Sequence, residues 1–155
     1  RDTSVTGVQT CALPISGFII YVNNSPIDWF SKKQSTVESS TFGSEFVAMR
    51  IAMERCKALR YKLKMFGFPI EGPTWMLGDN QSVVNSASLV ERKLNKKHNA
   101  ICFHAVREAV AAKWLMVGWE PTGSNIADIF TKVLNDETRA KLLRSIFIRL
   151  YAQED

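Results

Sequence analysis

The longest hydrophobic pattern in the chain has the period of an α-helix. Apolar side chains recur three or four positions apart along it. They are Phe42, Phe46, Met49, Met53, Cys56, Leu59, Leu63 and Phe66. This spacing places them on one helical face that packs against a core. Ser and Thr at residues 39–41 suit the N-cap, and Gly67 with Pro69 ends the pattern, so a helix is predicted over residues 39–66.

Glu45 interrupts the apolar face of this predicted helix. It lies three residues after Phe42 and four before Met49, so its carboxylate points toward the core. A carboxylate in that position needs a cationic partner, a shifted pKa or a metal ion. Two plainer interpretations stay open: Glu45 pairs with a lysine, or it lies at the boundary of the apolar face.

Shorter patterns predict the other elements. The predicted strands are residues 17–22, 27–31, 74–77 and 114–119, and the further predicted helices are residues 81–87, 100–112, 125–132 and 136–151. The first two strands form a hairpin, the third is expected to be buried, and Asp79 or Asn80 is expected to cap the helix that follows it. The order of elements predicts an α/β fold with a mixed sheet flanked by helices.

Residues 1–16 share none of these patterns. They contain turn-forming and small polar residues without a sustained strand or helix period, and they end in Leu13-Pro14-Ile15-Ser16. The stretch looks like translated adapter or vector sequence, or a disordered N-terminus, so the fold prediction leaves it out. The chain then divides into this segment, a domain at residues 17–134 and a C-terminal helix at residues 135–155.

Composition indicates one globular domain with surplus positive charge. Of 155 residues, 46% are hydrophobic and 23% are charged, and no apolar run is long enough to cross a bilayer, so no membrane partner is predicted. The net charge of +5 and pI of about 9.2 favour an acidic partner, nucleic acid first, although surplus lysine also keeps proteins soluble. Cys11, Cys56 and Cys102 lie far apart in no zinc-binding spacing. Cys56 and Cys102 are expected as small core residues in reducing, intracellular surroundings.

Two further acids occur where α/β proteins place their sites. Asp79 follows the strand at residues 74–77, and Asp128 lies in the first turn of the helix after the last strand. Two carboxylates about 4 Å apart repel by roughly 4 kcal/mol at an effective dielectric of about 20, so convergence with Glu45 favours a bound cation. Mg²⁺ prefers such oxygen ligands, and a pair of ions suits phosphodiester hydrolysis. The alternatives are a helix cap for Asp79 and a helix-dipole complement for Asp128.

The residues around the three acids form four blocks. They are residues 26–48, which include Ser44-Glu45-Phe46-Val47-Ala48; Gly78-Asp79-Asn80-Gln81-Ser82-Val83; His98-Asn99-Ala100-Ile101 with His104-Ala105-Val106-Arg107-Glu108; and Asn125-Ile126-Ala127-Asp128-Ile129-Phe130-Thr131-Lys132. In this order and spacing the series closely resembles the ribonuclease H domain of copia-type LTR retrotransposons, which lies next to the reverse transcriptase at the end of their polyprotein. The resemblance covers about Gly17 to Leu134.

The resemblance implies a ribonuclease H fold, a mixed sheet flanked by helices, with a site for two Mg²⁺ ions that Mn²⁺ can replace. It implies cleavage of the RNA strand in RNA–DNA hybrids during reverse transcription, beside the reverse transcriptase domain and within the cytoplasmic virus-like particle of an intact element. The family's glutamate, central aspartate and last aspartate match Glu45, Asp79 and Asp128 as catalytic and metal-binding residues. His104 and Arg107 match the helix before the last strand. Neither is expected to be catalytic, and His104 is expected to be a structural histidine with its hydrogen bonds satisfied.

The sequence departs from the family at its start. The family's first strand, which is central to the sheet and carries its first catalytic aspartate, would lie immediately before Gly17. Residues 1–16 hold that place, and Asp2 is the only acid upstream of Asp28. We therefore expect a truncated piece of a longer reading frame with little or no activity. The alternatives are a catalytically inactive module that binds nucleic acid or reverse transcriptase, and a relic fragment.

A basic stretch downstream of Asp79 suits the same partner. The expected nucleic-acid contacts are Asn80, Gln81, Arg92, Lys93, Lys96 and Lys97. Phosphate contacts of this kind would make binding salt-dependent, and the hybrid would be recognised by shape and 2′-hydroxyls rather than by sequence. A solvated loop with scattered lysines is the alternative.

Overall fold

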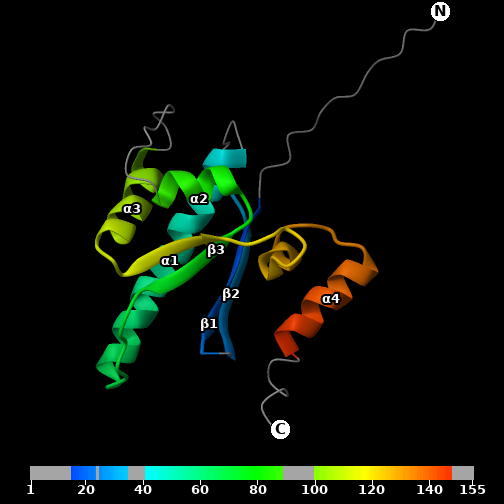
Figure 1. Ribbon diagram of the computed structural model, residues 1–155. Helices are drawn as coiled ribbons and strands as arrows, with labels where there is room; N and C mark the ends of the chain where they lie inside the picture. The colour runs from blue at the N-terminus through cyan, green and yellow to red at the C-terminus, as the bar shows by residue number, and fades with distance from the viewer. Residues whose placement is uncertain (1–14, 24, 35–40, 89–99, 148–155) are drawn as a thin grey trace, which may run out of the picture.

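The protein has the predicted α/β fold. The computed structural model describes residues 15–23, 25–34, 41–88 and 100–147 (Figure 1). The elements are β1 (Ile15–Val22), β2 (Ser25–Lys33), α1 (Thr41–Met65), β3 (Thr74–Gly78), α2 (Gln81–Ser88), α3 (Ala100–Ala111), β4 (Leu115–Trp119), the 3₁₀ helix η2 (Ile126–Phe130) and α4 (Asp136–Phe147). Residues 148–151, predicted to continue the last helix, lie outside the described part, and the predicted helix at residues 125–132 is a shorter 3₁₀ turn.

The hairpin β1–β2 begins two residues earlier than predicted. The strands are antiparallel, and Phe18 lies opposite Phe30 with the two rings stacked 5.1 Å apart. Ser16, which the sequence prediction left out with residues 1–16, belongs to β1 and is only 2% exposed. The amide of Gln34, just beyond β2, donates a 2.7 Å hydrogen bond to the Ser16 hydroxyl. This bond gives the buried Ser16 hydroxyl a hydrogen-bond partner, which the hydrophobic pattern of the sequence could not predict.

The second sheet pairs β3 with β4 in parallel. Thr74 lies opposite Leu115, and Gly78 lies opposite Trp119. The predicted mixture of antiparallel and parallel pairing is therefore present, but within the described residues it forms two separate sheets of two strands. The strand expected to join them would precede Gly17, and residues 1–14 lie outside the described part, so that strand stays a prediction.

Helix α1 packs against both sheets. Its buried residues Phe46, Met49 and Met53 form one cluster with side chains of α2, α3 and β4. Its next turns form a second cluster in which Ala52 and Cys56 contact the inner face of the hairpin. The predicted apolar face is confirmed from Phe46 to Cys56, whereas Cys102 is only partly buried.

Two predictions of burial are wrong. Phe66, placed on the core face of the helix, is 78% exposed, because the end of α1 extends past the elements that cover its first half (Figure 1). Trp75 and Leu77 of β3 are also exposed, at 62% and 55%. The helices cover only one face of the parallel pair, so alternate residues of β3 face solvent. Within the described ranges, no helix combines the length and apolar character needed to cross a membrane.

Candidate functional site

Asp79 lies directly after β3, where the strand end comes close to α1. A Cβ atom added to Gly78 would lie 3.0 Å from the Met49 side chain of α1. The indole N–H of Trp119 donates to the Asp79 carbonyl at 3.1 Å, and the Glu120 N–H donates to the Gly78 carbonyl at 2.9 Å. These backbone contacts hold Asp79 at the end of the parallel pair and leave its carboxylate available to other partners.

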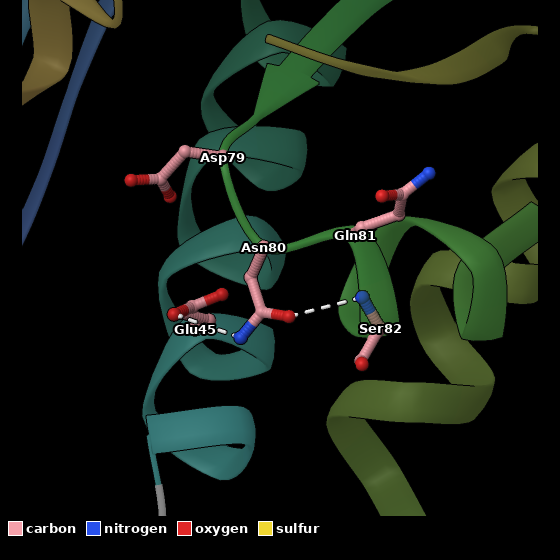
Figure 2. A pocket seen from close by; sticks show the side chains of 5 residues that line it. All are labelled: Glu45, Asp79, Asn80, Gln81 and Ser82. Carbon is pink, nitrogen blue, oxygen red and sulfur yellow. Dashed lines mark hydrogen bonds between the residues drawn. The ribbon is translucent and has the colours of Figure 1, made fainter. Parts of the chain in front are cut away.

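Glu45 lies in the second turn of α1 and is held by Asn80. The Asn80 amide donates to the Glu45 carboxylate at 3.2 Å, and its side-chain oxygen accepts from the Ser82 N–H at 3.0 Å (Figure 2). The same oxygen also accepts from the Val83 N–H at 3.4 Å. Asn80 is therefore the N-cap of α2, one of the two residues predicted for that role. The other, Asp79, does not cap the helix and keeps its carboxylate for the acid cluster.

Asp128 is held inside the turn η2. The Asn125 side chain accepts from the Ala127 N–H at 3.2 Å, which caps the turn, and donates to the Asp128 carboxylate at 3.3 Å. Asp128 is 6% exposed, so this donor compensates part of the cost of burying its carboxylate. Asp128 therefore does more than complement a helix dipole.

The turn η2 is docked on the outer face of the hairpin. The Ser31 hydroxyl donates to the Phe130 carbonyl at 2.7 Å. A Cβ atom added to Gly17 would lie 2.6 Å from the Thr131 methyl group and 2.8 Å from Phe130 Cβ. Glycine at this position permits the close approach, which fixes Asp128 relative to β1.

Lys132 connects Asp128 to Asp79. Its amino group donates to the Asp128 carboxylate at 2.8 Å and lies 3.6 Å from the Asp79 carboxylate. Burial lowers the pKa of Lys132, but the hydrogen bond from its amino group to Asp128 and the charges of both aspartates outweigh that effect, so the pKa is raised. The sequence prediction did not assign Lys132 a role. Its position four residues after Asp128 was the available signal.

Glu45 belongs electrostatically to the same cluster. Burial raises the pKa of its carboxyl, and the negative charge of Asp79 raises it further. The hydrogen bond from Asn80 and the positive charge of Lys132 lower it, but the net shift is upward. The three predicted acids thus lie around one region, although they come from three separate elements.

A hollow of about 360 Å³ opens beside two of the acids, lined by Glu45, Asp79, Asn80, Gln81 and Ser82. Figure 2 shows the Glu45 and Asp79 side chains on one side of the β3–α2 connection and the exposed Gln81 side chain on the other. The remaining predicted nucleic-acid contacts, Arg92, Lys93, Lys96 and Lys97, lie outside the described residues.

The donor set suits a divalent cation in type and charge. Carboxylate oxygens are the ligands that Mg²⁺ prefers, and Asp79 and Asp128 already converge on one cation, the Lys132 ammonium. In the part of the chain that the structure describes, no group of three or more Asp, Glu, His or Cys side chains is drawn together closely enough to hold an ion. A metal would therefore need to replace Lys132 between the two aspartates.

The predicted role of His104 is structural. The residue is exposed on α3, and its ring lies edge-on to Phe103 at a centroid distance of 5.3 Å. The guanidinium of Arg107 lies over the same Phe103 ring, 5.1 Å from its centre. Both side chains serve here as a cover over a buried aromatic ring.

Together, the fold and its acid cluster define a small α/β domain with three carboxylates and a lysine at one site. Two curated relatives are retrovirus-related Pol polyproteins from the Arabidopsis thaliana transposons RE1 and RE2. The first is 28% identical over 134 residues, which is 86% of this chain, and the second is 27% identical over 120 residues, which is 77%. The chain spans 9% and 8% of the length of these relatives. It is thus a distant homologue of part of a retrotransposon polyprotein.

No family model and no solved structure matches the chain.

Proposed function

We propose that the chain is the ribonuclease H part of a copia-type retroelement polyprotein, which cleaves the RNA strand of RNA–DNA hybrids during reverse transcription. The observation that carries the proposal is the convergence of Asp79 and Asp128, from separate elements, on one cation beside Glu45. Three carboxylates gathered at one site repel one another unless a cation lies among them. The similarity to transposon Pol polyproteins supports the same reading.

Two of the three acids have an asparagine partner that orients them. In this proposal Glu45, Asp79 and Asp128 hold Mg²⁺, or Mn²⁺ in its place. Asn80 orients Glu45, and Asn125 orients Asp128. Bound metal ions of this kind activate a water molecule and stabilise the leaving oxygen of a phosphodiester. The hollow beside Glu45 and Asp79 would admit the scissile phosphate.

The hybrid would extend from this hollow over neighbouring polar residues. Gln81 is exposed there, and the basic residues at positions 92–97 follow α2 in sequence. We expect the reverse transcriptase domain of the same polyprotein to present the hybrid, inside a cytoplasmic virus-like particle. Phosphate contacts by lysine and arginine would make the affinity fall as salt rises.

The test is cleavage of a labelled RNA strand in an RNA–DNA hybrid with Mg²⁺. We would compare this chain, from which little or no cleavage is expected, with a longer polyprotein segment that also contains the preceding residues. Asp79→Asn should lower cleavage by the longer protein about 10²–10³-fold, because metal ligation supplies several kcal/mol of transition-state stabilisation. Asp136→Asn, whose side chain is 93% exposed on α4, is the matched control and should keep full activity. An intact hybrid with both proteins would overturn the proposal.

The second candidate is a module that binds the hybrid without cleaving it. It is favoured by the lysine that neutralises two of the acids, and by the lack of a ready three-acid metal group among the described residues. Binding and cleavage measured together separate the candidates. This candidate predicts that the longer protein binds the hybrid and leaves it intact. Replacing Lys96 and Lys97 by glutamate should then lower hybrid affinity without loss of the fold, while Asp79→Asn leaves affinity unchanged.

A further inference from the structure

Lys132 occupies a special position in the acid cluster. Of the described basic residues, it alone forms ion pairs with Asp79 and Asp128. The first of these acids follows the parallel pair of strands, and the second lies in the turn docked on the hairpin. Without a cation between them, the two carboxylates would repel each other across this junction.

The backbone of Lys132 is fixed beside Asp128, whereas its side chain is partly exposed to solvent. The Lys132 N–H donates to the Asp128 carbonyl at 3.0 Å, so the residue stays within one turn of that acid. Its side chain is 47% exposed, whereas the side chain of Asp128 is 8% exposed. The ammonium can therefore swing into solvent on its flexible stem while the carboxylate stays where it is.

We propose that Lys132 is a built-in counterion that occupies the place of a divalent cation in the metal-free site and leaves when the metal binds. This inference rests on the proposed metal site. An ammonium ion at 2.8 Å from a carboxylate and a magnesium ion at about 2.0–2.1 Å would compete for the same oxygens and repel each other. The two occupants therefore exclude one another.

The competition has two measurable consequences. In metal-free protein the lysine holds the acid cluster together, so removing its charge lowers the stability of the empty site. In metal-binding experiments the lysine reduces the apparent affinity, because the metal binds only the fraction of molecules whose lysine has moved out. A static structural ion pair predicts the first consequence but not the second.

The experiment titrates Mn²⁺ into the protein and measures free Mn²⁺ by electron paramagnetic resonance. Lys132→Met should bind Mn²⁺ about tenfold more tightly than the wild type, a difference equal to about 1.4 kcal/mol. Lys132→Arg keeps the charge and should show no such gain. Lys57→Met is the matched charge control, because Lys57 lies 12 residues beyond Glu45 on α1, about 18 Å along the helix. The Mn²⁺ affinity of this variant should stay near that of the wild type.

Thermal unfolding in a chelator provides the second readout. Without metal, Lys132→Met should melt at a lower temperature than the wild type. On addition of Mn²⁺, its melting temperature should rise by more than that of the wild type. If Lys132→Met does not fold, Lys132→Gln provides the same neutral test. Equal or weaker Mn²⁺ affinity of the neutral variant would overturn the inference and leave the proposed metal site intact. Absence of binding by every variant would instead overturn the metal site, and the competition with it.

Discussion

The two sheets of the protein differ in what packs on their second face. The hairpin packs its Phe18 face on α1, and η2 covers the Gly17 end of the opposite face, although Trp29 on that face is 63% exposed. The parallel pair is covered on one face only. Its residues Met76 and Leu115 pack toward the helices, whereas Trp75 on the other face is 62% exposed.

This difference shows how the candidate site is assembled. Asp79 comes from the end of the parallel pair, whereas Asp128 reaches the site only because its turn docks on the hairpin. Helix α1 packs on both sheets and carries Glu45. Lys132 then joins the two aspartates across the junction. The site is therefore sensitive to any change that shifts one sheet relative to the other.

The largest effect is expected from Phe46→Ala, which removes packing between α1, the helix that contacts both sheets, and the cluster of α2, α3 and β4. Phe46 is 0% exposed and contacts the Phe103 ring edge-on at 5.4 Å. The substitution should cost about 3–5 kcal/mol of unfolding free energy, and amides of β1 and β3 should lose hydrogen-exchange protection together. Phe68→Ala, at a position 59% exposed, is the matched control for urea unfolding and should change little. Loss of protection in β3 alone, with β1 unchanged, would show that α1 does not unite the sheets.

A smaller effect is expected from Gly17→Ala, which should disturb only the contact between η2 and the hairpin. The added methyl group meets Thr131 and Phe130, so one of the packed elements must move, at a cost of about 1–3 kcal/mol. Urea unfolding measures the loss, and Mn²⁺ affinity shows whether Asp128 has moved. Gly123→Ala, with nothing within 4 Å of the added atom, should leave both quantities unchanged. An unchanged Gly17→Ala protein would mean that the close approach does not hold the turn.

The next effect depends on pH and concerns Glu45. Its carboxyl has a raised pKa in the folded protein, so the folded state binds more protons than the unfolded state, whose glutamate titrates near about 4.3. Stability from this group is thus lost as the pH rises from the unfolded to the folded pKa. In metal-free buffer Glu45→Gln should gain stability relative to wild type as the pH rises above the unfolded-state pKa of about 4.3. A difference independent of pH in thermal melts would contradict the raised pKa.

The smallest effect is expected on the open face of the parallel pair. Leu77 is 55% exposed, and threonine suits a strand, so Leu77→Thr should change the unfolding free energy by no more than about 0.5 kcal/mol. Urea unfolding of the two proteins measures the difference. A loss comparable to that of Phe46→Ala would show that this face is covered in solution.

The elements themselves were largely predictable because they follow from local patterns. The period of Phe46, Met49 and Met53 predicts α1 and its core face, and the position of Asp79 after a strand predicts its place in the site. The same local reasoning misjudged Trp75. A short apolar run is compatible with a strand that is buried on one face or on both faces. Only the arrangement of the helices around the sheet determines how many faces are buried.

The connections within the site could not be predicted. Lys132 pairs with Asp79 across 53 positions of sequence, and no local pattern encodes that distance. The choice of Asn80 rather than Asp79 as the cap was likewise open, because both residue types cap helices well. In the folded protein, the capping residue Asn80 also donates a hydrogen bond to Glu45.

Gln34 has a consequence for the connection between the hairpin and α1. Its buried amide donates to the Ser16 hydroxyl at 2.7 Å and to the Ser44 carbonyl at 2.8 Å, which closes the intervening chain at its base. For a loop closed in this way, doubling the length costs only about 0.6 kcal/mol of entropy. Glu45, the residue directly after Ser44, is thereby tied to the hairpin through one buried side chain.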